Sequence, residues 1–380
     1  MKADWLPFAR PVIDEAMIAE VADTLRSQWV ASGPNVAAFE AALSSYFGGR
    51  PTRVLTSATA AMEVAFQACG IGPGDEVITS AMTFFSVGNM IVKCGAKAVF
   101  VDCDLVTRNL DLDQVERAIT PRTRAIVPTH FAGLSCEMDR LLEIAARHGI
   151  RVVEDAALAI GSSWKGRKTG SFGDIATFSF HPNKNITTIE GGAIVLSDEA
   201  EAKRVEMLRF HGISKLADGT RDVEVAGGKF NLSDVSARLG LSQLKRLDGF
   251  CATRRSLAGR YFERLRDSAL AVLPAPAHPG EPEGHSWNMF CVLLPLGRMA
   301  LTRKQFVERM AEHGIGIGIS YEAMHLTTLF RGLGHREGEC PNAERISRET
   351  VSLPLHAAMT QADVDRACAV FLEVLGEAVR

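Results

Sequence analysis

The chain has 380 residues, of which 47% are hydrophobic and 23% are charged, and its formal net charge is −3. This composition excludes a disordered chain, a coiled coil and collagen, and it suits two or three packed subdomains. The sequence offers no basic stripe for nucleic acid and no apolar run long enough to span a bilayer. We therefore expect no nucleic acid partner and no membrane partner.

The N-terminus and the cysteines both indicate a cytoplasmic protein. The first residues carry charges and prolines where a secretory signal peptide needs an apolar stretch. The eight cysteines are scattered and form no C-x-x-C pair. Buried, reduced thiols explain them better than a metal site or disulfides, so we expect no metal.

The predicted elements begin with an N-terminal arm and continue into a sheet. Helical spacing appears at 13–27 and 35–46, on either side of Ser32-Gly33-Pro34. From about 52 to 200, short apolar runs alternate with helical patterns. The expected strands are 53–56, 76–79, 98–102, 125–129, 151–155, 175–180 and 193–197, and the expected helices between them are 60–69, 86–94, 112–119 and 138–148. This alternation predicts an α/β fold with a mostly parallel, seven-stranded sheet covered on both faces.

The rest of the chain predicts a second, smaller unit. Helices are expected at 199–211 and 231–268, and the second is long enough to bridge two domains. Residues 269–284 are rich in Pro and Gly and predict a loop. A strand at 289–294 and helices near 302–313 and 360–378 complete the pattern. We expect an N-terminal arm and a large domain over 1–250, and a small α+β domain over 251–380.

Polar or aromatic residues follow several predicted strands, where ligands bind in open α/β sheets. The segment 56–61, TSATAA, has small residues and hydroxyls at the start of a helix, which suits a phosphate, although an ordinary N-cap explains it too. Phe84 follows the second strand and can either cover a flat ring or pack in the core. His130 follows the fourth strand and is as readily structural as ligand-binding.

The next two predicted strands carry the most informative pair. Asp155 ends the fifth strand, and Lys184 lies just beyond the sixth. A carboxylate at the end of a buried strand is costly unless it is paired or used, although a helix N-cap would also explain it. A desolvated lysine has a lowered pKa and a nucleophilic neutral amine, although a lone lysine is usually solvated. An anion cradle, an aromatic cover, an acid and an amine together are what is needed to hold pyridoxal 5'-phosphate (PLP) as a Schiff base.

At this point the sequence resembles the sugar aminotransferases of the DegT/DnrJ/EryC1/StrS family, which have PLP-dependent transferase fold type I. The resemblance covers nearly the whole chain, and the members that form UDP-4-amino-4-deoxy-L-arabinose look most similar. It rests on motifs in a fixed order: SGP at 32–34, TSATAA at 56–61, GIGPGDEVI at 70–78, EDAA at 154–157, GRKTGSFGD at 166–174, SFHPNK at 179–184, EGG at 190–192, FNLSD at 230–234 and LGLSQL at 239–244.

The resemblance implies cofactor-binding roles for the matching residues. Lys184 would hold PLP as a Schiff base and then act as the general base. Asp155 would pair with the ring nitrogen, and Phe84 would stack on the ring. The residues that would hold the phosphate are Ala58, Thr59 and Ser179.

The resemblance also implies a homodimer with shared active sites. Asn231 matches an Asn that reaches the phosphate of the neighbouring subunit's cofactor. Three residues match segments near the sugar site: Ser32, Tyr321 and His325. The implied reaction moves an amino group from L-glutamate to a keto sugar, a nucleotide-linked 4-keto sugar in first place, by a ping-pong mechanism.

Two positions depart from the family's motifs, and other reactions stay open. Leu158 stands where the family has His or Gln, and Leu cannot form a hydrogen bond to the cofactor. Asn288 stands where close relatives often have His. A PLP enzyme of the same fold with a different ketone or reaction, and a non-catalytic PLP-binding protein, are the alternatives. A sugar dehydratase of this family would carry His in place of Lys184.

Overall fold

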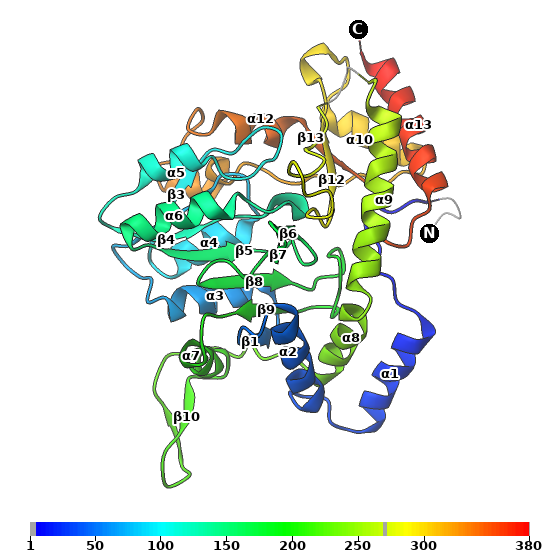
Figure 1. Cartoon of the computed structure of the whole chain (residues 1–380). Coiled ribbons are helices and arrows are strands. Elements are labelled where there is room, and N and C mark those ends of the chain that lie inside the picture. The colour runs from blue at the N-terminus through cyan, green and yellow to red at the C-terminus, as the bar shows by residue number, and fades with distance from the viewer. Residues whose placement is uncertain (1–4, 269–271, 380) are drawn as a thin grey trace.

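A mostly parallel sheet forms the centre of the molecule in the computed structural model, which describes residues 5–268 and 272–379. Its strands are β1 (Thr52–Leu55), β2 (Glu76–Ser80), β3 (Lys97–Val101), β4 (Thr123–Val127), β5 (Arg151–Asp155), β8 (Ile175–Ser179) and β9 (Gly192–Val195). The strand order is β1-β9-β8-β5-β4-β2-β3, and β9 runs in the opposite direction to the other six strands (Figure 1). The predicted α/β class, the seven-stranded sheet and each of its expected strands are confirmed.

Helices cover both faces of this sheet, because successive side chains of a strand point to opposite sides. In β4, Ala125 and Val127 pack in one core with residues of the third and fourth helices, whereas Ile126 packs in another core with residues of the fifth and sixth. The helices are α1 (Glu15–Arg26), α2 (Pro34–Tyr46), α3 (Ala58–Ala68), α4 (Phe85–Lys93), α5 (Leu112–Ala118), α6 (Met138–His148), α7 (Glu199–Arg209) and α8 (Asp234–Leu244).

The C-terminal part has its own apolar core. Tyr261, Phe290 and Phe371 are fully buried in it, and β12 pairs with β13 antiparallel. Its elements are α9 (Leu247–Leu265), β12 (Phe290–Leu293), α10 (Arg303–Glu312), α11 (Thr328–Gly332), α12 (Pro341–Glu349), β13 (Thr350–Leu353) and α13 (Gln361–Ala378). The start of α9, at Leu247 and Cys251, packs instead in the core beside α2 and α8. The expected domain division at residue 250 stays a prediction.

Short elements complete the described chain. The small strands are β6 (Ser163–Trp164), β7 (Arg167–Lys168), β10 (Ile213–Lys215) and β11 (Arg221–Val223), and the 3-10 helices are η1 (Phe131–Gly133), η2 (Leu296–Arg298) and η3 (Met324–Leu326). The β10–β11 hairpin projects from the body of the molecule (Figure 1). In residues 5–268 and 272–379, no helix has both the length and the apolar character that a membrane span requires.

One helix expectation is wrong in detail. The expected helix at 231–268 is two helices, α8 and α9, separated at Lys245 and Arg246. It also begins later, because the Ser233 side chain accepts from the backbone N–H of Ser236 and caps α8. Asn231 is instead extended and bridges Leu55. In the expected loop at 269–284, residues 269–271 lie outside the described residues, and the remainder forms no helix.

Candidate active site

A cavity of about 230 Å³ lies at the carboxyl ends of the parallel strands. Asp155 is the last residue of β5, and Ser179 is the last residue of β8. The loop after β8 brings Lys184 to the same cavity, while α3 begins at its wall. The predicted site residues that line it are Ala58, Thr59, Phe84, Asp155, Ser179, Lys184 and Tyr321.

Lys184 presents a partly buried amine to this cavity. Its backbone N–H donates to the His181 carbonyl at 2.9 Å, and the next residue, Asn185, is buried and donates to the Ser286 carbonyl at 3.0 Å. These bonds fix the loop that carries the lysine. Burial lowers the pKa of Lys184 to about 8, although the Asp155 carboxylate opposes this shift. The neutral, nucleophilic amine is therefore much more populated near neutral pH than it is in a solvated lysine.

Asp155 is only 6% exposed, and burial raises its pKa. Its Oδ1 accepts from the Ala157 backbone N–H at 3.2 Å. Its Oδ2 lies 3.4 Å from the hydroxyl oxygens of both Thr83 and Thr129. A buried carboxylate with these partners is suited to pair with a protonated ring nitrogen.

The start of α3 forms an anion cradle beside the lysine. The first backbone N–H groups of a helix have no acceptor within it, and here Ala58 and Thr59 occupy those positions. The Ser57 side chain accepts from the Ala60 N–H at 3.0 Å and caps the helix. A Cβ at Gly192 would lie 2.5 Å from the Ala58 nitrogen, so glycine is required there for β9 to pass this close. The helix N-terminus favours a phosphate at this place.

Aromatic and apolar side chains cover the other walls. Phe84, which precedes α4, is 49% exposed and lies with its ring centroid 5.6 Å from that of Tyr321. Leu158 also lines the cavity and is 5% exposed. Such walls suit a flat aromatic ring. The amine, the buried acid, the helix N-terminus and these walls together fit PLP.

Three predicted site residues do not line this cavity. Ser32 Oγ accepts from Asn231 Nδ2 at 2.6 Å and donates to the Leu232 carbonyl at 2.8 Å. His325 is fully buried, and its Nε2 lies 3.0 Å from Oε1 of Glu344. A role for these three residues at the active site stays a prediction.

His130 and Glu154 form a buried pair outside the cavity. His130 Nδ1 accepts from the Cys136 backbone N–H, so its Nε2 carries the proton toward Glu154 at 3.0 Å. Of the two interpretations of His130, the structural one holds in this arrangement.

Several residues of the site were not predicted from the sequence. Thr83 and Thr129 contact Asp155, and the side chains of His181, Asn183 and Glu190 line the cavity. Thr83 follows the predicted strand at 76–79, and Thr129 ends the predicted strand at 125–129. A position at a strand end is the same signal that indicated Asp155. Their contact with Asp155 depends on which strands are neighbours, and the sequence does not state that order.

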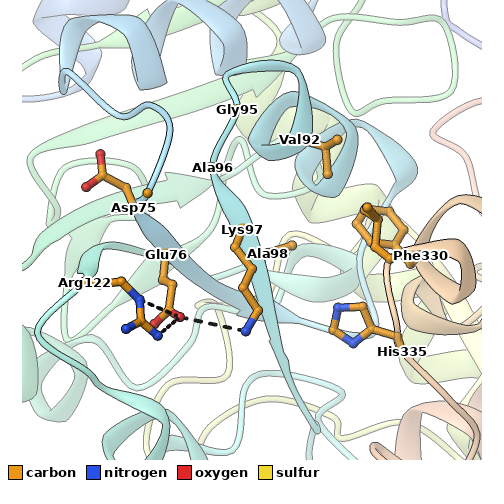
Figure 2. Close-up of a pocket in the computed structure, with 12 residues that line it drawn as sticks. Asp75, Glu76, Val92, Gly95, Ala96, Lys97, Ala98, Arg122, Phe330 and His335 are labelled. Atoms are coloured by element: carbon orange, nitrogen blue, oxygen red, sulfur yellow. Dashed lines mark hydrogen bonds and ion pairs between the residues drawn. The ribbon is translucent and has the colours of Figure 1, made fainter.

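A second cavity, of about 500 Å³, lies at the opposite edge of the sheet. Glu76 and Lys97, the first residues of β2 and β3, line it together with Arg122 (Figure 2). The Glu76 carboxylate accepts from Arg122 at 2.8 Å and lies 3.8 Å from Lys97 Nζ. The Glu76 carboxylate is thus taken up by ion pairs with both cations. The cavity is also at the amino ends of the strands, so the first cavity is the candidate active site.

The fold and the first cavity define a PLP-binding α/β enzyme, and comparison with known proteins gives its family. The profile of the DegT/DnrJ/EryC1/StrS aminotransferase family matches residues 11–372. The spore coat polysaccharide biosynthesis protein SpsC of Bacillus subtilis (strain 168) is 39% identical over 371 residues, which cover 95% of each chain. The chain belongs to the DegT/DnrJ/EryC1/StrS aminotransferase family.

Solved structures of similar proteins agree with this family. The PMP form of Spr1654 from Streptococcus pneumoniae has a TM-score of 0.92 and 32% identity, with 98% of each chain covered. Helicobacter pylori PseC, an aminotransferase involved in the biosynthesis of pseudoaminic acid, has a TM-score of 0.92 and 26% identity, covering 98% of this chain and 100% of its own. Spr1654 also has a PLP form. This protein is therefore a PLP-dependent aminotransferase of fold type I; the expected closeness to enzymes that form UDP-4-amino-4-deoxy-L-arabinose stays a prediction.

Proposed function

We propose that this enzyme transfers the amino group of L-glutamate to a keto sugar by a ping-pong mechanism. The acceptor that we favour is a nucleotide-linked 4-keto sugar. The observation that carries this proposal is the placement of Lys184 and Asp155 in one cavity beside the N-terminus of α3. The family and the sugar-related relatives support a sugar as the acceptor.

The residues divide the work of binding and proton transfer. PLP supplies an electrophilic carbon and an electron-accepting ring when bound. Lys184 Nζ would hold the cofactor and then, in each half-reaction, move the proton between the substrate carbon and the cofactor carbon. Asp155 keeps a proton at the ring nitrogen, and Phe84 stacks on the ring. The residues proposed to bind the phosphate are Ala58, Thr59 and Ser179.

The single cavity supports alternation between donor and acceptor. Lys184 and Asp155 line the same cavity, so glutamate and the sugar would react at the same amine. They would then enter in turn, which is the order that a ping-pong mechanism requires. Tyr321 at the cavity wall, together with Ser32 and His325 further away, is proposed to contact the sugar.

We also propose that two copies of the chain form a cytoplasmic homodimer with shared active sites. Large apolar side chains are exposed near Asn231 and the cavity mouth: Trp29 is 59% exposed, Ile189 57% and Phe210 41%. Ile189 precedes Glu190, which lines the cavity. Asn231 does not line its own cavity, so Asn231 of the partner subunit would complete the phosphate site. A dimer would remove these side chains from water.

Transfer of a labelled nitrogen tests the proposed reaction. The PLP-loaded enzyme is incubated with ¹⁵N-labelled glutamate and with a set of nucleotide-linked 4-keto sugars. The masses of the products are then measured by mass spectrometry. We expect 2-oxoglutarate and a ¹⁵N-labelled amino sugar. Formation of 2-oxoglutarate without labelled sugar would contradict the acceptor class, and absence of 2-oxoglutarate would contradict the donor.

A further inference from the structure

Two buried hydroxyls share the Asp155 carboxylate. Oγ1 of Thr83 and Oγ1 of Thr129 are 2.9 Å apart, and each is 3.4 Å from Oδ2 of Asp155. Thr83 is fully buried and Thr129 is 2% exposed. Thr83 follows β2 and Thr129 follows β4, so two neighbouring connections of the sheet converge on the end of β5.

The protons of these hydroxyls determine the direction of the contact. An ionised carboxylate only accepts hydrogen bonds, whereas each hydroxyl has one proton to donate. At 2.9 Å one threonine donates to the other, and the second threonine then donates to Oδ2. With the Ala157 N–H on Oδ1, both oxygens of Asp155 accept from neutral donors. Such donors favour the charged form of a carboxylate.

We propose that Thr83 and Thr129 are positioning residues that orient Asp155 and keep it ionised, so that the proton stays on the ring nitrogen of the cofactor. This inference rests on the proposed role of Asp155 as the partner of that nitrogen. Burial by itself favours the neutral acid and would move the proton from the ring to Asp155. A ring without this proton accepts electrons less readily, so proton removal from the donor would slow.

The other groups that face Asp155 do not replace the hydroxyl pair. Lys184, in the loop after β8, favours the carboxylate only while its amine is charged, and its pKa is about 8. His130 bonds to Glu154 through Nε2 and to the Cys136 backbone N–H through Nδ1, so neither ring nitrogen is free for Asp155. Tyr321 approaches from the segment before η3, and burial raises its pKa. Threonine hydroxyls do not titrate, so they stabilise the carboxylate at every working pH.

Thr83→Val and Thr129→Val remove each hydroxyl and nearly keep the side-chain shape. Thr83→Ser keeps the hydroxyl and is the conservative rescue. Thr79→Val is the matched control, because Thr79 is fully buried in β2 and its hydroxyl donates at 3.0 Å to the Val127 carbonyl, not to Asp155. The double variant Thr83→Val/Thr129→Val leaves no unpaired hydroxyl, so it serves if a single variant folds poorly.

The readout is the ¹⁵N NMR shift of PLP labelled at the ring nitrogen and bound to each variant. We expect the valine variants to move this resonance toward the unprotonated form and to lower kcat about tenfold, with KM for glutamate nearly unchanged. Thr83→Ser and Thr79→Val should keep the resonance of the parent.

Two results would overturn the inference: a parent-like resonance in both valine variants and their double variant, or the same displacement in Thr79→Val. Asp155→Asn separates this failure from failure of the proposed function. If Asp155→Asn displaces the resonance and the valine variants do not, only the hydroxyl pair is refuted. If Asp155→Asn leaves the resonance unchanged, the proposed role of Asp155 is itself refuted, and the inference with it.

Discussion

The Asp155 carboxylate raises the pKa of the Lys184 amine, while burial lowers that pKa to about 8. Asp155 reaches the cavity from the end of β5, and Lys184 reaches it from the loop after β8. The strands β5 and β8 are parallel neighbours in the sheet. The balance places the change from charged to neutral amine in the range where the enzyme would work. The acid therefore affects the lysine before any cofactor is bound.

This balance predicts how the apoprotein takes up PLP. Only the neutral amine attacks the cofactor, so the uptake rate should rise with pH and level off above about 8. Asp155→Asn removes the charge that raises the lysine pKa, so its midpoint should fall below that of the parent. Stopped-flow absorbance over a pH series measures both. A midpoint near the ordinary lysine value of about 10.4 would contradict the burial of Lys184.

Mixed dimers test whether Asn231 acts across the subunit interface. Lys184→Ala subunits and Asn231→Ala subunits are combined, and activity is measured at limiting PLP. If the site takes Lys184 from one subunit and Asn231 from its partner, each heterodimer contains one intact site. Random mixing then restores about a quarter of the parental sites.

The control for this experiment is each variant assayed alone, where we expect little activity. If Asn231 served its own subunit, every site of the mixture would carry one of the two lesions. Activity of the mixture equal to the average of the separate variants would therefore reject the cross-subunit contact.

The buried Glu154 predicts a large effect on stability. Its carboxylate accepts from the backbone N–H groups of Gly170, Phe172 and Gly173 and pairs with His130. Glu154→Ala leaves these donors buried without an acceptor and should lower the free energy of unfolding by about 3–5 kcal/mol. Urea denaturation of the apoprotein measures this change.

Glu312→Ala is the control for Glu154→Ala, because the Glu312 side chain is 63% exposed, and we expect a change within about 0.5 kcal/mol. A loss of similar size in both variants would show that the buried network contributes nothing special to the fold.

We expect a substitution at Leu158 to raise the affinity for PLP. The side chain lines the cavity, where the family's motif has His or Gln. Leu158→Gln supplies a polar group that can bond to the cofactor, so PLP affinity should rise about two- to tenfold, as expected for one added hydrogen bond. Leu158→Met is the apolar control and should leave the affinity unchanged. Equal affinities in the parent and both variants, measured by fluorescence titration, would place Leu158 out of contact with the cofactor.

The sequence predicted the sheet well because its pattern is local. Each strand is a short apolar run between turn residues, and Asp155 and Lys184 stand at or just beyond the ends of two such runs. The β10–β11 hairpin escaped prediction because its residues are largely exposed and carry no apolar alternation. The break between α8 and α9, at Lys245 and Arg246, contains no Gly or Pro that would predict it from the sequence.

Contacts between segments that are far apart in the chain could not be predicted from the sequence. Ser32 and Asn231 are 199 residues apart and bond to each other. His325 bonds to Glu344, a partner that no motif indicates. The contacts of Thr83 and Thr129 with Asp155 require β2, β4 and β5 to be consecutive in the sheet, although β3 lies between β2 and β4 in the sequence. Strand order, which tertiary packing decides, carries this information.

Amino transfer from glutamate to the cofactor at Lys184 is tested by the absorbance spectrum of the PLP-loaded protein before and after addition of L-glutamate. We expect that the band of the cofactor linked to Lys184 disappears and that the band of the aminated cofactor replaces it, with release of 2-oxoglutarate. Lys184→Ala should bind PLP without the linked band and should show no turnover. A linked band in the parent that no amino donor changes, or turnover in Lys184→Ala, would refute the role of Lys184 in amino transfer.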